Sequence, residues 1–356
     1  MSTPYKELPD QSFWSRAVSA NNFLSLKNVY QKKFEISDKD RIVTAGSCFA
    51  QHIARQLQKN GYNYKDYEPP PKFLSEKKAA AFNYSVYSAR YCNIYTARQL
   101  RQTYERAFNL RAPSEDIWEV HGGFVDPFRP ILEPGPFFCI EEFNASRTTH
   151  LQAVRNVFTK SDLFIFTFGL TEAWVSKKDG SVLPVCPGTR APWDKNHTVG
   201  KFDSTKYEFK NFNFKEILAD MEWLIENIRT KNPSVRFLFT VSPVPLVATA
   251  TGKHVLTATM YSKSVLRAIA GELSDHDPAI DYYPSYELVA SHPMRGAYFN
   301  PDLRTVAAEG VDQVMKYFFY EHKPFTVKAN SMPEEHEGAD SEVVCEEMLQ
   351  EQEGES

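Results

Sequence analysis

The stretch that decides the fold is Arg41-Ile42-Val43-Thr44-Ala45-Gly46-Ser47-Cys48-Phe49-Ala50, in which a short β-branched run meets a glycine and a serine. The run is typical of a buried strand, and the residues after it have the spacing of a helix. The turn between them places the Ser47 hydroxyl beside the unpaired N–H groups of a helix N-terminus. Turns of this kind present nucleophilic serines, although glycine and serine are also ordinary turn and capping residues. Ser47 is therefore the first candidate for a functional residue.

Downstream of this turn, apolar strands alternate with amphipathic helices. Phe49, Ile53 and Leu57 share one helix face, and residues 217–228 form the clearest amphipathic helix. The alternation predicts an α/β fold with a mostly parallel sheet. Five strands are expected, at residues 42–45, 62–67, 163–168, 235–241 and 279–282.

Three small or polar residues directly follow predicted strands: Ser47, Gly169 and Ser242. In open parallel sheets, ligands bind beyond the carboxyl ends of the strands. We therefore expect these residues to meet at one edge of the sheet and to form part of a site there.

Several motifs resemble, in their order along the chain, those of a known family. They are Gly46–Ala50, Thr167–Trp174, Thr240–Val244, Tyr261–Ser264 and Tyr283–Glu287. On these motifs, approximately residues 40–320 are identified as a member of the GSCFA family, which is similar to the SGNH (GDSL-type) hydrolases. The resemblance implies a three-layer α/β/α sandwich of the SGNH or flavodoxin-like kind, with serine esterase or acyl-transfer chemistry.

The resemblance also implies roles for individual residues. Ser47 matches the serine that attacks an acyl carbonyl in SGNH enzymes. Its own N–H and that of nearby Gly169 are the backbone donors expected to hold the oxyanion. Those enzymes carry an asparagine where this chain has Thr171, whose hydroxyl donates one hydrogen bond over a shorter reach. Asn93, in a loop before a predicted helix, is expected to supply the amide instead, unless it is only a turn residue.

The catalytic base is expected to be a histidine outside its usual position. The Asp-x-x-His motif of SGNH enzymes falls on Asp302-Leu303-Arg304-Thr305, so the aspartate is present and threonine replaces the histidine. A serine hydroxyl without a base is a poor nucleophile. His292, in the same loop region as Asp302, is the first candidate and His254 the second; each is otherwise a solvated loop residue.

The roles of two further residues, Cys48 and Glu172, are left open. Cys48 would be a thiol nucleophile if the helix N-terminus lowered its pKa, whereas a small buried hydrophobic residue is the commoner role. Glu172 would orient a base, bind a substrate hydroxyl, or form an ion pair at the strand end. The sequence has no glycine-rich phosphate loop, zinc-ligand spacing or dinucleotide fingerprint, so we expect no metal and no cofactor.

Composition indicates a soluble globular protein with an acidic tail. Of the 356 residues, 42% are hydrophobic and 24% charged, and no apolar run reaches the ~18 residues of a membrane span. The start lacks a secretory signal and the five cysteines are irregularly spaced, so a cytoplasmic location is expected. No basic stripe predicts nucleic-acid binding. Residues 326–356 hold ten acidic residues against one lysine, typical of a disordered tail that leaves docking to a protein partner open.

The expected organisation is an N-terminal arm (1–40), one α/β domain (41–325) with insertions at about 109–140 and 175–212, and the tail (326–356). The expected function is a serine esterase or acyltransferase that acts on an acyl ester of a small molecule or a glycan. Because the asparagine and the histidine of the SGNH motifs are both replaced, the alternative is a non-catalytic ligand- or glycan-binding protein that retains the pocket.

Overall fold

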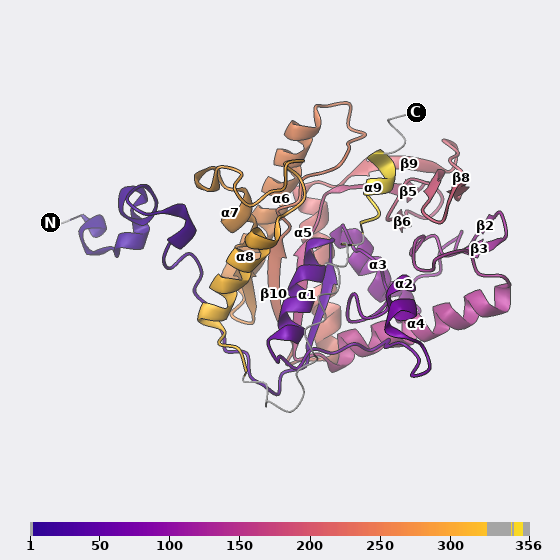
Figure 1. The fold of residues 1–356 in the computed structure, drawn as a ribbon, viewed down its shortest axis with the longest axis horizontal. Helices are drawn as coiled ribbons and strands as arrows, with labels where there is room; N and C mark the ends of the chain where they lie inside the picture. Colours follow the sequence, from indigo (N-terminus) through magenta and orange to yellow (C-terminus); the bar gives the residue numbers. More distant parts are fainter. Residues whose placement is uncertain (1–2, 326–342, 344, 352–356) are drawn as a thin grey trace.

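The computed structural model of the chain describes residues 3–325, 343 and 345–351. Its centre is a sheet of four strands, each parallel to its neighbours, in the order β1-β4-β10-β11 (Figure 1). The strands are β1 (Ile42–Gly46), β4 (Leu163–Phe168), β10 (Arg236–Val241) and β11 (Ile280–Tyr283). The prediction of an α/β fold with a mostly parallel sheet is confirmed, and four of the five predicted strands form.

The prediction of a strand at residues 62–67 is wrong, because this segment makes only an isolated parallel bridge with β1. Separate segments bond the outer edge of β1 in turn. Lys65 N–H donates to the Ile42 carbonyl at 2.8 Å, and Ile94 N–H donates to the Gly46 carbonyl at 2.8 Å. Between them, the Ser88 hydroxyl accepts from Thr44 N–H at 3.0 Å. These loops satisfy the edge of β1, which leaves no room for a continuous fifth strand.

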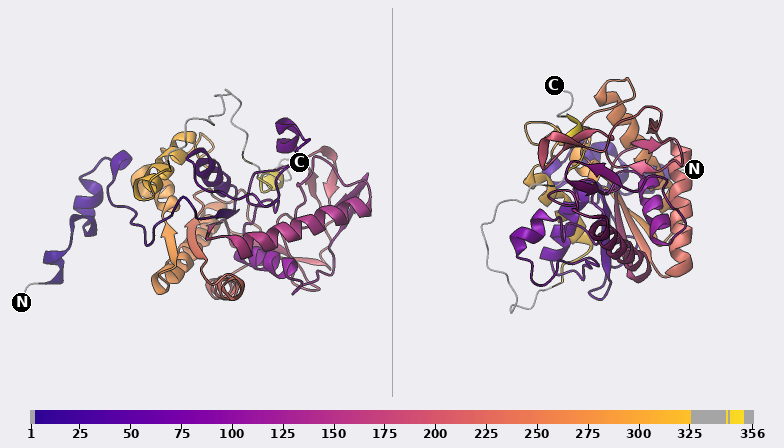
Figure 2. Two further views of the ribbon diagram at one scale, coloured as in Figure 1. Left: turned by 90° about the horizontal axis from the view of Figure 1, so that it is seen from below. Right: turned by 90° about the vertical axis from the view of Figure 1, so that its right-hand side faces the viewer.

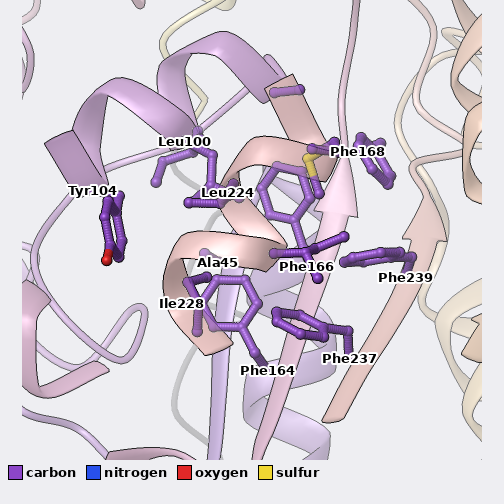
Figure 3. Close-up of a cluster of buried hydrophobic side chains, with 14 of the residues drawn as sticks. Ala45, Leu100, Tyr104, Phe164, Phe166, Phe168, Leu224, Ile228, Phe237 and Phe239 are labelled. Atoms are coloured by element: carbon purple, nitrogen blue, oxygen red, sulfur yellow. The ribbon is translucent and has the colours of Figure 1, made fainter. Parts of the chain in front are cut away.

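Helices cover both faces of the sheet, and the side chains of β4 alternate between them. Phe164, Phe166 and Phe168 point into a large apolar cluster formed with α3 to α6 (Figure 3). Leu163 and Ile165 pack with α1, α7 and α8 on the opposite face. The first group is α3 (Ala97–Ala107), α4 (Ile140–Lys160), α5 (Phe214–Lys231) and α6 (Val255–His276); the second is α1 (Phe49–Lys59), α7 (Ser285–Ala290) and α8 (Ala308–Glu321). Within the described part of the chain, none of the helices is long and apolar enough to cross a membrane.

The two insertions pack against each other beyond the parallel sheet. After the short helix α2 (Glu76–Ala81), the first contributes the hairpin of β2 (Trp118–Val120) and β3 (Gly123–Val125). The second contributes an antiparallel sheet, β6-β5-β9, and the pair β7-β8. The bounds are β5 (Glu172–Ser176), β6 (Val182–Leu183), β7 (Thr189–Ala191), β8 (Asp194–Val199) and β9 (Tyr207–Asn211). Trp118, Leu183 and Val199 share a small apolar cluster that joins the two insertions.

The two ends of the chain are placed differently. Near the N-terminus, short helical turns extend away from the sheet (Figures 1 and 2). They are η1 (Pro4–Glu7), η2 (Asp10–Ser12), η3 (Ser15–Ser19) and η4 (Phe23–Ser25). Most of the predicted acidic tail, residues 326–342, 344 and 352–356, lies outside the described residues. The part that is described, with the short helix α9 (Met348–Glu351), packs on the protein beside the insertion strands (Figure 1).

Candidate active site

Ser47 directly follows β1 and is almost fully buried, with 3% of its surface exposed. The turn depends on Gly46, whose φ of +140° is rarely adopted by residues with a side chain. A Cβ there would lie 2.4 Å from the Thr167 carbonyl oxygen, so only glycine fits between β1 and β4. The Ser47 hydroxyl is buried, yet it makes no hydrogen bond with any described residue. A buried polar group without a partner is uncommon and marks a candidate functional site.

Ser47 shares a small cavity with Gly169 and Ser242, the residues that follow β4 and β10. The structure thus brings the three strand-end residues together at one edge of the sheet. The small cavity has a volume of about 10 Å³, room for about one water molecule. Gly169 permits the close approach, since a Cβ there would lie 3.0 Å from the Ser47 Cβ.

Lys263 of α6 lines the same small cavity, although it is absent from the predicted site. The residue is 2% exposed, and its Nζ donates to the Gly169 carbonyl at 2.6 Å. Burial lowers the pKa of Lys263 to about 8, against the opposing effect of Glu347. A lysine with this pKa is partly neutral near neutral pH and can accept a proton. The available signal was its place in the Tyr261–Ser264 motif, next to buried Ser262.

The structure does not bring the predicted histidine base to the small cavity. His292 begins the turn η5 (His292–Met294), is exposed, and stacks on Trp14 with ring centroids 5.3 Å apart. Asp302 is also exposed and accepts from the Thr305 hydroxyl at 2.7 Å, within its own turn. Neither residue lines the small cavity, so His292 and Asp302 form no pair with Ser47 in this structure.

Two further predicted site residues make local structural contacts. His254 is the N-cap of α6, where its Nδ1 accepts from Leu256 N–H at 3.1 Å. The Thr171 hydroxyl donates to Asn211 Oδ1 at 2.7 Å. These contacts occupy both side chains, and neither residue lines the small cavity.

The backbone groups predicted to hold an oxyanion are already bonded. Ser47 N–H donates to the Thr167 carbonyl at 3.1 Å, and Gly169 N–H donates to the Tyr95 carbonyl at 3.2 Å. At the start of α1, by contrast, Cys48 N–H donates to no acceptor among the described residues. Cys48 also lines the small cavity, which makes this N–H, at the positive end of the helix dipole, a candidate donor to an oxyanion next to Ser47.

Asn93 is buried in the loop before α3, and both of its N–H donors face a carboxylate. Its backbone N–H donates to Glu346 Oε1 at 3.1 Å, and its Nδ2 donates to Glu346 Oε2. The Tyr95 hydroxyl donates to the same Oε2 at 2.7 Å. The Tyr87 hydroxyl bonds Asn93 Oδ1, which fixes the amide with its NH₂ group toward Glu346. Asn93 and Tyr95 therefore present hydrogen-bond donors to the carboxyl group of Glu346, whose pKa is raised by burial.

The neighbours of Glu346 also contact the site. Glu347 forms an ion pair with Arg304 at 3.0 Å and lines the small cavity, and burial raises its pKa to about 8. The neighbouring thiol of Cys48 lowers the pKa of Cys345 to about 5. The Cys345 thiol and burial in turn raise the pKa of Cys48. Cys48 is thus kept as a neutral thiol, which disfavours the alternative of a thiol nucleophile.

A larger cavity of about 320 Å³ lies next to the small one, and Tyr95 and Glu347 line both. Glu172, a predicted site residue, lines the larger cavity. Its carboxylate accepts from the Thr249 hydroxyl at 2.8 Å, and burial raises its pKa. Three further aromatic side chains line this cavity: Trp174, Phe202 and Phe209. An aromatic wall with one carboxylate suits a ligand that has apolar faces and hydroxyl groups.

No histidine in the described part of the chain lines either cavity. Eight of the nine histidines are described; the ninth, His336, falls outside the described residues. Among the described residues, Lys263 is therefore the nitrogen base that lines the small cavity.

Comparison with known proteins agrees with the motifs around this site. No curated protein sequence matches the chain significantly. The model of the GSCFA family matches residues 41–318, a range that includes the whole parallel sheet, Ser47 and Lys263. The chain belongs to the GSCFA family.

Proposed function

We propose that the protein is a serine esterase or O-acyltransferase in which Ser47 is the nucleophile and Lys263 the general base. The observation that supports this most strongly is the small cavity, where the unbonded hydroxyl of Ser47 and a buried amine with a pKa of about 8 occur together. A serine needs a base to attack a carbonyl, and a partly neutral lysine can fill that role. We also infer that the sheet, with helices on both faces, is a three-layer α/β/α sandwich of the SGNH or flavodoxin-like type.

In the proposed reaction, the neutral amine of Lys263 takes the proton of the Ser47 hydroxyl while Oγ attacks the acyl carbonyl carbon. The carbonyl oxygen gains the negative charge, which Cys48 N–H stabilises. Collapse of the tetrahedral intermediate breaks the ester C–O bond, and the leaving alcohol takes the proton from Lys263. Water or a sugar hydroxyl then attacks the acyl-serine by the same route and restores Ser47.

Two contacts bear on the assignment of these roles. The hydrogen bond from Lys263 to the Gly169 carbonyl needs one N–H, so it persists when the amine is neutral and keeps the amine in place. Asn93, the predicted amide donor, contacts Glu346 in this structure and is therefore not assigned to the oxyanion. The larger cavity, with its aromatic wall and Glu172, suits the sugar of an acylated glycan.

A non-catalytic ligand- or glycan-binding protein is the second candidate function. It is favoured by the described histidines, none of which lines either cavity, and by the N–H groups of Ser47 and Gly169, which are bonded to backbone carbonyls. Under this alternative, no reaction takes place at the small cavity, and the larger cavity binds the ligand.

Covalent labelling with a fluorophosphonate separates the two candidates, because the reagent reacts with activated serines. We expect one adduct per chain, located by peptide mass spectrometry on the peptide that contains Ser47, and no adduct in Ser47→Ala. If Ser47 stays unlabelled after prolonged incubation in every chain that retains it, the esterase proposal fails and the binding protein is favoured.

A further inference from the structure

The C-terminal segment Cys345–Glu347 packs against the candidate active site, and its two glutamates are buried. Glu346 is 0% exposed and Glu347 is 7% exposed. Glutamates are almost never buried so completely unless partners are provided for them. The predicted acidic tail therefore differs from expectation in this part, because these residues are not solvated.

The partners of Glu346 come from a distant part of the chain. Asn93 N–H, Asn93 Nδ2 and the Tyr95 hydroxyl donate to its two carboxyl oxygens. Three donors on two oxygens match an ionised carboxylate, which only accepts hydrogen bonds. Asn93 is held by Tyr87 and by Gln51, whose Nε2 donates to Asn93 Oδ1 at 3.2 Å. The donors of Asn93 and Tyr95 thus form a recess that is held in place by residues other than Glu346. Such a recess can bind a carboxylate of another molecule in the same way.

Glu347 adds a second contact that closes the site. It pairs with Arg304 and lines both the small and the larger cavity, so it lies between them. With the segment in place, the cavity at Ser47 has room for about one water molecule, too little for an ester. Displacement of the segment would free the Asn93 and Tyr95 donors and remove Glu347 from the wall that the two cavities share, which Leu170 and Leu246 also line.

We infer that the recess formed by Asn93 and Tyr95 is a carboxylate-binding subsite, and that Cys345–Glu347 is an intramolecular ligand that occupies it in place of an external one. The external ligand is an acyl ester that carries a free carboxylate. Binding at the recess is argued from the contacts alone, whereas competition with an ester at Ser47 rests on the proposed function.

The position of the segment is tested in the full chain by cross-linking Cys48 to Cys345, whose thiols lie close enough for each to shift the pKa of the other. Diamide takes two hydrogens from the two thiols and is reduced to its hydrazine, while one S–S bond forms. We expect the Cys48–Cys345 peptide pair in wild type and a yield at least about tenfold lower in Glu346→Gln, whose NH₂ group would face the recess donors. Glu222→Gln, at an exposed glutamate of α5, is the matched control with the wild-type yield. Absence of this pair from wild type would overturn the placement.

Competition is tested by the rate at which fluorophosphonate labels Ser47. Loss of one hydrogen bond to a charged group shifts an equilibrium by about tenfold or more. We therefore expect labelling at least about tenfold faster in Glu346→Gln than in wild type or Glu222→Gln. Equal labelling rates would refute competition. If no variant is labelled at all, the proposed function fails, and the cross-linking yield still decides whether the segment is docked.

The ligand class is tested with two esters of similar length in the Glu346→Gln chain: nitrophenyl succinate, which has a free carboxylate, and nitrophenyl butyrate, which is neutral. We expect kcat/KM about tenfold higher for the succinate, and a smaller ratio once Tyr95→Phe removes one donor. Succinate binding to the Glu346→Gln chain, with and without Tyr95→Phe, is also measured by calorimetry. This tests the same contribution of the Tyr95 hydroxyl without turnover. Equal kcat/KM values and no succinate binding would rule out a carboxylate subsite.

Discussion

Replacement of Ser47 by alanine is expected to lower the turnover of nitrophenyl acetate by about 1,000-fold or more, because no other group would attack the ester carbonyl. The change removes a buried hydroxyl that bonds no described residue, so the fold should lose no interaction. The measurement is kcat/KM of the full chain, with the melting temperature as a check on folding. Ser264→Ala, at an exposed serine of α6, is the matched control and should keep the wild-type rate.

An unchanged rate in Ser47→Ala would contradict the assignment of Ser47 as the nucleophile. If Ser47→Ala is folded and turns over the ester as fast as wild type and Ser264→Ala, Ser47 is not the nucleophile. The small cavity would then have to be interpreted as part of a binding site.

Replacement of Lys263 by methionine is expected to lower kcat/KM by about 100- to 10,000-fold, the usual contribution of a general base. Methionine has a similar length and no charge, so it can fill the buried space while it loses the bond to the Gly169 carbonyl. Lys253→Met, at an exposed lysine before α6, is the control for the loss of one positive charge.

A structural role for Lys263 gives a different pattern. If the lysine only holds Gly169 in place, Lys263→Met should lower the melting temperature, while the folded protein keeps its kcat/KM. That result would require another base for Ser47, and it would contradict the proposed pair.

The strand-end edge could be predicted from sequence because it depends on local patterns. Ser47, Gly169 and Ser242 each follow an apolar run that is long enough for one buried strand, and parallel strands end at a common edge. The strand at 62–67 failed for a non-local reason, since its pairing depended on loops that reach β1 from Ser88 and Ile94.

The base could not be predicted because it depends on packing between distant elements. A lysine in a helix is normally taken as solvated, and only the packing of α6 on β10 and β11 of the sheet buries Lys263 beside Gly169. His292 lies close to Asp302 along the chain, but in the fold its ring stacks on Trp14 of the N-terminal arm.

The buried position of the C-terminal segment Cys345–Glu347 also depends on distant parts of the chain. Its acidic composition predicts solvation, and nothing local in Cys345–Glu347 indicates a binding partner. The partners, Asn93 and Arg304, are supplied by loops that only the folded domain brings together.

The central claim, that Lys263 activates Ser47, is tested most directly by the pH dependence of fluorophosphonate labelling, with the adduct located by mass spectrometry and the hydrolysis of the reagent subtracted. Only the neutral amine accepts the serine proton, so the labelling rate should rise as pH increases through the lowered pKa of about 8. Glu347, Cys48 and Arg304 also act on Lys263, and the pKa of Glu347 is itself raised to about 8, so the profile is repeated in Glu347→Gln. We predict a rising limb near about pH 8 in wild type, with the adduct on Ser47. In Glu347→Gln the limb should move to lower pH, because Glu347 raises the pKa of Lys263. A rate that does not change between about pH 6 and about pH 10, or an adduct on another residue, would contradict the account.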